Sequence, residues 1–143
     1  MSSIYNTFKT LGYDDNSIFG ILGNALTESS LNGDSISQSK LYHGLLQNSV
    51  PIKKAIVNKY GDYSLKNQMK YVHDWVSGAD WVKKNADTTT YNGKYKMSGY
   101  KTASEAADAF TRLYERPVIL DNTGNVTGYR KADERMANAE LIA

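Results

Sequence analysis

The amino-acid sequence predicts a mainly α-helical single domain over residues 1–143, with a small irregular or β-hairpin segment after its second helix. Apolar residues recur at helical spacing along most of the chain, and capping or stopping residues flank these stretches. Residues 30–49 lose this periodicity and carry small polar residues and glycines. A length of 143 residues suits one domain with a proper core and is short for two.

The first two helices are predicted at the N-terminus. Residues Ile4, Phe8 and Leu11 have helical spacing, and Gly12 is a typical stop. Asp14 or Asp15 can cap a second helix, which should end near Ser29. One face of this second helix is apolar and should pack on the core: Ile18, Ile21, Leu22, Ala25 and Leu26.

Two further helices and a short turn are predicted in the middle of the chain. Pro51 fits the first turn of a helix that ends at Gly61, and Ser64 can cap the next helix. Residues 80–85 can add a short helical turn. Trp75 and Trp81 have two interpretations, as core anchors or as platforms for sugar rings, and the pattern favours core anchors.

The C-terminal third begins with residues 86–101, whose Thr, Gly, Tyr and Lys content is typical of a surface loop. Thr102 and Glu105 form a capping-box pattern for a buried helix that Pro117 ends. Residues 121–124 predict a turn, and residues 131–141 predict a closing helix.

Composition excludes several classes of function. The net charge of +2, from 17 basic and 15 acidic residues, is too small to indicate a nucleic-acid partner. The chain has no cysteine and only two histidines, so we expect no metal and no cofactor. Tyrosine (11 residues) far outnumbers phenylalanine (3 residues), which suits a wet sugar-binding groove but equally a half-buried surface.

Neither a signal peptide nor a membrane span is predicted. The N-terminal residues 1–5 lack the charged start and apolar run of a secretion signal. No apolar stretch approaches the length that crosses a bilayer, so we expect no membrane insertion. If the protein acts outside the cell that made it, another route must carry it there.

Glu28 is the sharpest candidate for chemistry. It lies in the last turn of the second predicted helix, at the negative end of the helix dipole, and the turn at residues 30–33 follows directly. This placement favours a protonated carboxyl, which a general acid requires. Taken alone, however, the local pattern favours an ordinary surface glutamate.

The wider pattern resembles a known family. Gly23-Asn24-Ala25-Leu26-Thr27-Glu28-Ser29, then Gly44-Leu45-Leu46-Gln47, then Tyr114-Glu115-Arg116-Pro117 occur in the order and spacing of the phage tail lysozyme family. This family is related to goose-type lysozymes and soluble lytic transglycosylases. Gln68 also falls where the family tends to carry a glutamine, although a solvated helix residue is the simpler interpretation. The resemblance spans about residues 15–137.

The resemblance implies a lysozyme-like fold and cleavage of the β-1,4 bond between N-acetylmuramic acid and N-acetylglucosamine in peptidoglycan. Glu28 matches the catalytic acid, and Gly44, Leu45 and Gln47 match the segment that lines the cleft. Peptidoglycan glycan strands are the implied partner, with other phage tail proteins or domains as further candidates. The implied location is the phage tail or the host cell wall, during entry or lysis. The chain departs from the family pattern at Gly33, where proline is common, and at Asn48, where an aromatic residue is common.

The second catalytic group is left open by the sequence. Inverting hydrolysis needs a carboxylate about 6.5–9.5 Å from the acid, and retaining hydrolysis needs one at about 5–5.5 Å. Asp34 is the first candidate, although it also fits a turn aspartate beside Gly33. A lytic transglycosylase would need no second carboxylate, because a hydroxyl of the sugar itself attacks.

Tyr114 and Glu115 are the remaining candidate groove residues. Tyr114 can belong to the core or can place its hydroxyl near Glu28. Glu115, at a helix end, favours a structural ion pair or hydrogen bond over catalysis. The alternative from another class is a catalytically silent module that binds cell wall or builds the tail.

Overall fold

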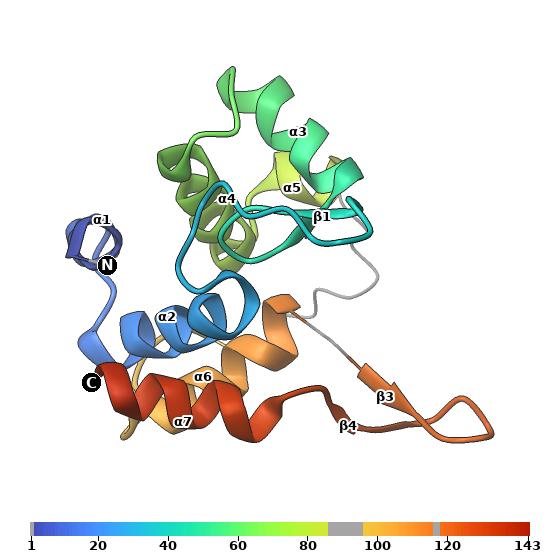
Figure 1. Ribbon diagram of the computed structural model, residues 1–143. Helices are drawn as coiled ribbons and strands as arrows, with labels where there is room; N and C mark the ends of the chain where they lie inside the picture. The colour runs from blue at the N-terminus through green and yellow to red at the C-terminus, as the bar shows by residue number, and fades with distance from the viewer. Residues whose placement is uncertain (1, 86–95, 116–117) are drawn as a thin grey trace.

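A computed structural model describes residues 2–85, 96–115 and 118–143, and its architecture is mainly α, as predicted (Figure 1). Two small antiparallel sheets accompany the helices. In chain order the elements are α1 (Ser2–Thr10), α2 (Asp15–Ser29), β1 (Tyr42–His43), β2 (Asn48–Ser49), α3 (Val50–Tyr60), α4 (Leu65–Ser77), α5 (Asp80–Asn85), α6 (Ala103–Phe110), the π-helical turn η2 (Thr111–Glu115), β3 (Val118–Leu120), β4 (Val126–Tyr129) and α7 (Ala132–Ile142).

Helices α2, α6 and α7 lie side by side in the lower part of Figure 1 and pack closely. Two glycines of α2 permit this approach. A Cβ added at Gly20 would lie 2.6 Å from the backbone carbon of Ala106 in α6, and one at Gly23 would lie 2.7 Å from the backbone nitrogen of Ala139 in α7. Any larger residue would therefore push these helices apart, because real Cβ atoms do not approach backbone so closely.

Both predicted ends of α2 are confirmed. At its start, Oδ1 of Asp14 accepts a hydrogen bond from the backbone N–H of Ser17 at 2.9 Å. At its end, Ser30 turns into the left-handed region with φ 54°, and its N–H donates to the carbonyl of Leu26 at 3.0 Å. These caps fix where the helix stops and therefore where Glu28 stands.

The predicted hairpin after α2 is confirmed as the β1–β2 sheet, which pairs Tyr42 with Ser49 and His43 with Asn48. It lies with α3, α4 and α5 in the upper part of Figure 1. The predicted helix stop at Gly61 is also confirmed, with φ 102°. Leu11 lies just past the end of α1 and is exposed, so only Ile4 and Phe8 of the first predicted stripe are buried.

Gln68 is a buried residue of α4, and its interpretation as a solvated glutamine is wrong. Its Oε1 accepts a hydrogen bond from the N–H of Leu45 at 2.8 Å. Its Nε2 donates to the carbonyls of Gly33 and Tyr63, each at 3.0 Å. One side chain thus satisfies three backbone groups and ties the segment after α2 to α4.

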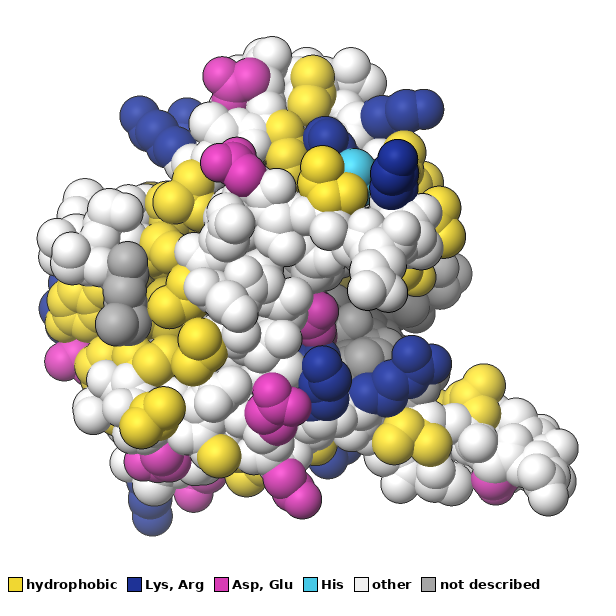
Figure 2. Space-filling view, viewed as in Figure 1, with side chains coloured by type: hydrophobic (Ala, Val, Ile, Leu, Met, Phe, Trp, Pro, Cys, Tyr) yellow, Lys and Arg dark blue, Asp and Glu magenta, His cyan; other side chains and the backbone are white. Residues whose placement is uncertain are grey.

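The sequence predicted that the helix beginning after Thr102 continues to Pro117, but α6 ends at Phe110. It changes to the π-helical turn η2 at Thr111, and the predicted stop at Pro117 lies outside the described residues. The predicted turn at Asp121 is confirmed by the 3.1 Å hydrogen bond from the Gly124 N–H to its carbonyl. Strands β3 and β4, which flank this turn, were not predicted, and this hairpin extends away from the body (Figures 1 and 2).

Replacing Gln68 with alanine should destabilise the fold, because it leaves the buried partners of both amide atoms without a hydrogen bond. We expect the free energy of unfolding to fall by about 2–4 kcal/mol in urea titrations. The matched control is Gln38→Ala, at an exposed glutamine of the segment between α2 and β1, which should change stability by less than about 0.5 kcal/mol. Equal effects of the two substitutions would contradict the role of Gln68.

Candidate active site

Glu28 lies in the last turn of α2 and is half-buried, with its side chain 20% exposed. The neighbouring Ser29 is buried and joins this helix end to the next segment. Its Oγ donates to the carbonyl of Leu45 at 2.6 Å and accepts from the N–H of Asn32 at 3.2 Å. The end of α2 that carries Glu28 is therefore fixed by hydrogen bonds to the segment that follows it.

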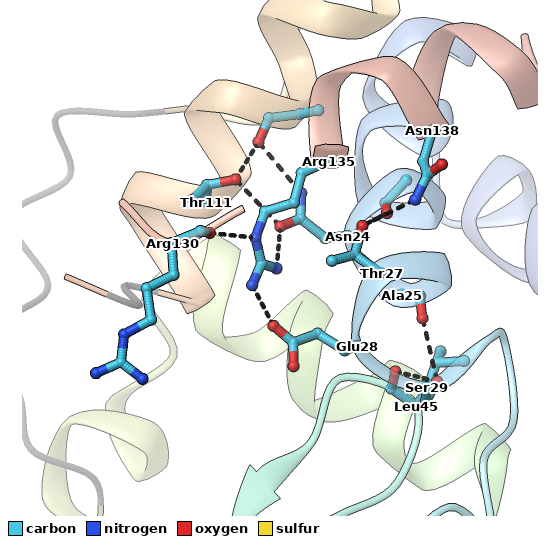
Figure 3. A network of polar contacts seen from close by, with 12 residues as sticks. Asn24, Ala25, Thr27, Glu28, Ser29, Leu45, Thr111, Arg130, Arg135 and Asn138 are labelled. Carbon is cyan, nitrogen blue, oxygen red and sulfur yellow. Dashed lines mark hydrogen bonds and ion pairs between the residues drawn. The ribbon is translucent and has the colours of Figure 1, made fainter. Parts of the chain in front are cut away.

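Arg135 of α7 forms an ion pair with Glu28 (Figure 3). The side chain of Arg135 is only 3% exposed, so its charge has little access to water. Its Nη1 donates to Oδ1 of Asn24 at 2.9 Å, and its Nε donates to the carbonyl of Arg130 at 3.2 Å. A buried guanidinium needs such partners, because an unpaired buried charge is very costly.

Asn24 is the centre of this network and lies one turn before Glu28 in α2. Its Oδ1 accepts from Arg135 and also from Oγ1 of Thr111, at 3.1 Å. Its Nδ2 donates to the carbonyls of Gly20 and Ala107, at 3.1 and 3.2 Å. The fully buried amide thus binds α2, α6, η2 and α7 together around the Glu28 carboxyl.

Glu115, the last residue of η2, brings a second carboxyl to this region. Its Oε1 is buried and has no hydrogen-bond partner among the described residues. Burial raises the pKa of Glu115 well above its usual range, the negative charge of Glu28 raises this pKa further, and Arg135 lowers it.

Glu115 also borders a pocket, here called the aromatic pocket, that lies next to the β1–β2 sheet. Figure 2 shows an acidic side chain in a hollow of the surface, with Lys or Arg side chains beside it. Aromatic rings with hydroxyl groups at such a surface suit sugars, which present apolar faces and polar edges. The walls of the aromatic pocket are Tyr42, Leu46, Gln47, Asn48, Ser49, Ile52, Tyr71, Trp75, Tyr114 and Glu115.

Of the two interpretations that the sequence left open for Tyr114, the structure shows packing against the core, and its hydroxyl bonds to Asn48 and not to Glu28; the residue also borders the aromatic pocket. Its ring stacks on Phe110 with centroids 5.1 Å apart, and its hydroxyl donates to Oδ1 of Asn48 at 2.6 Å. The hydroxyl partner is thus the residue where the family often has an aromatic side chain. Trp75 is both buried and a pocket wall, whereas Trp81 donates its indole N–H to Asp74 at 2.7 Å, outside the pocket.

The three predicted cleft residues occupy different places. Gly44 has φ 88°, and a side chain there would collide with Gln68 and Tyr63. Leu45 is buried, and its N–H and carbonyl both bond within the protein, so it supports the groove from the core. Gln47 borders the aromatic pocket, and its Nε2 donates to the carbonyl of Gly44 at 2.8 Å.

Asp34 lies in a different part of the surface. It is exposed, and its N–H donates to Oδ1 of Asn32 at 2.9 Å, as in a turn aspartate. It borders a second pocket, together with Gly44 and Tyr63, whereas Glu115 borders the aromatic pocket. Of these two candidates for the second carboxyl, Glu115 is the one whose pKa the negative charge of Glu28 raises.

Arg135 and Asn24 are residues of the candidate site that the sequence did not single out. Asn24 belongs to the motif that ends in Glu28, so its position one turn earlier could have suggested a partner. Arg135 gave no signal, because an arginine on the last predicted helix is usually solvated. Among the described residues no cluster of three metal-binding side chains occurs, and no described helix is long and apolar enough to cross a membrane.

The family model described as phage tail lysozyme matches residues 1–143, which is the full chain. Comparison with curated proteins gives no match.

The raised pKa of Glu115 predicts a dependence of stability on pH. A carboxyl whose pKa is higher in the folded protein binds more protons when folded, so stability is lost as the pH rises above the unfolded value. We expect the unfolding free energy of the native chain to fall relative to that of Glu115→Gln as the pH rises from about 4 to neutrality. Urea unfolding at a series of pH values measures this difference.

The control for this pH series is Glu134→Gln, at an exposed glutamate of α7. Its unfolding free energy should run parallel to that of the native chain at all pH values. A parallel curve for Glu115→Gln as well would show that Glu115 has an ordinary pKa in the folded protein.

Proposed function

This chain belongs to the phage tail lysozyme family, and from that premise we propose that it is a muramidase with Glu28 as its general acid. Membership supports a lysozyme-like, cell-wall-lytic function, with peptidoglycan as the substrate and the phage virion or the cell wall as the location. The proposed bond is the β-1,4 link from N-acetylmuramic acid to N-acetylglucosamine. The proposed setting is phage entry or host lysis, with other tail proteins as possible companions.

The observation that carries the proposal is the position of Glu28 at the end of α2. It is half-buried, and the buried Arg135 forms an ion pair with it. Its charge raises the pKa of Glu115, which is a wall of the aromatic pocket. A general acid must be fixed in direction and shielded from bulk water, so that its proton reaches the glycosidic oxygen. This arrangement supports catalysis better than it supports a silent wall-binding module, which needs no half-buried carboxyl held in place by a buried arginine.

The aromatic pocket is the proposed seat of a sugar ring. Gln47 and Asn48 bring amide groups to its wall, and amides pair well with the acetamido groups of both peptidoglycan sugars. Tyr114 and Trp75 bring ring surfaces to the same pocket. We propose Gly44 and Leu45 as supporting residues, because they hold the segment that presents Gln47.

Hydrolysis is favoured over transglycosylation by the second carboxyl. Hydrolysis requires a group that activates water or shields the sugar cation, whereas transglycosylation proceeds without one. Glu115 supplies a carboxyl in the right region, and Asp34 remains the alternative on the neighbouring pocket. The chemical form of the product ends distinguishes these two reactions.

Replacing Glu28 with glutamine should lower the rate of peptidoglycan cleavage by about 10²–10⁴-fold, because an amide cannot donate the required proton. The measurement is mass spectrometry of muropeptides released from purified cell walls, in which hydrolysis by the native chain leaves reducing ends and not 1,6-anhydro ends. The control is again Glu134→Gln, which should digest at the native rate. Undiminished release by Glu28→Gln would exclude Glu28 as the acid.

A further inference from the structure

The buried oxygen of Glu115 is a group that the packing does not explain. Oε1 of Glu115 has no hydrogen-bond partner among the described residues, although the described network around it is well satisfied. The nearby guanidinium of Arg135 binds Glu28, Asn24 and the carbonyl of Arg130. The positive charge of this region is thus directed to Glu28 and not to Glu115.

An ionised Glu115 would be expensive in this position. The buried Oε1 of an ionised Glu115 loses its hydration and gains no partner in return, whereas in a protonated carboxyl it is only a polar group to bury. The charged or titratable groups that face it are Glu28 from α2, Arg135 from α7, Tyr71 from α4 and Tyr114 of its own turn. Arg135 is the only cation in this set, and it is already paired.

We infer that Glu115 is the second carboxyl of the active site and that, in the empty groove, it holds the one proton of the Glu28–Glu115 pair. This inference rests on the proposed function for its meaning in catalysis. One proton on two carboxyls leaves a single negative charge, which matches the single positive charge of Arg135. The π-helical turn η2 places Glu115 at the pocket wall, and such turns occur often at functional sites.

The pair then returns to its starting state in each reaction cycle. The proton moves from Glu115 to Glu28, and Glu28 then donates it to the glycosidic oxygen. The bond from that oxygen to C1 breaks at the same time, and its electron pair stays on the oxygen. The pair is then doubly ionised beside a positively charged sugar centre, which it stabilises. Water adds to C1 and gives one proton back to the pair. Asp34 cannot share this proton from its exposed position at the other pocket.

The test is a pH titration of the glutamate side-chain carboxyl carbons by nuclear magnetic resonance on the full chain. The chain has only five glutamates, so each signal can be assigned by its loss in a glutamine variant. We expect the signal of one carboxyl carbon to report a carboxyl that stays protonated to a clearly higher pH than those of the exposed glutamates. This signal should be absent in Glu115→Gln. In Glu28→Gln it should titrate at a lower pH, because the neighbouring negative charge is gone and Arg135 is released.

Two outcomes would overturn the inference. The signal of Glu115 titrates together with that of the exposed Glu134, or the late-titrating signal disappears in Glu28→Gln, which would place the proton on Glu28. Glu115→Gln should also lower muropeptide release at least tenfold while keeping the native circular dichroism spectrum. If the native chain releases no muropeptides, the proposed function fails, but the titration still decides where the proton is.

Discussion

The buried charge of Arg135 is the constraint on which the rest of the structure depends. A guanidinium always carries its charge, so the fold must supply it with acceptors wherever it is shielded from water. Here the acceptors are the carboxylate of Glu28, the amide oxygen of Asn24 and a backbone carbonyl. The catalytic candidate is therefore held by the same interaction that stabilises the helix packing.

This constraint explains why α2 approaches its neighbours so closely. Arg135 can reach Glu28 and Asn24 only if α7 lies almost in backbone contact with α2, which Gly23 allows. Asn24 in turn reaches the carbonyl of Ala107 in α6 because Gly20 leaves no side chain between the two helices. The small residues and the buried polar network thus depend on each other.

A second set of hydrogen bonds fixes the segment that forms one wall of the aromatic pocket. Ser29 holds the carbonyl of Leu45, and Gln68 holds its N–H, so the segment before Gln47 is fixed from both α2 and α4. The rings of Tyr114, Tyr71 and Trp75 pack edge-on and close the opposite side. The candidate acid and the candidate sugar pocket are therefore supported by separate sets of hydrogen bonds.

The sequence was sufficient for most of the helices and for the place of Glu28 in the last turn of α2, because helix periodicity and caps are local signals. Asp14, Ser64 and Thr102 cap helices as predicted, and their side chains bond within the next three residues. The roles of Arg135 and Gln68 were not predictable, because their partners lie 107 and 23 residues away in sequence. The β3–β4 strands were missed because their residues do not alternate in polarity, and Ile119, Leu120 and Val126 are exposed.

The central claim is that Glu28 and Arg135 form a real and strong pair, and a double-mutant cycle tests it most directly. The unfolding free energies of the native chain, Glu28→Gln, Arg135→Gln and the double variant give a coupling energy from which the lost bonds to Asn24 cancel. We predict a favourable coupling of about 1–3 kcal/mol at neutral pH. Additive effects, within about 0.5 kcal/mol, would contradict the account.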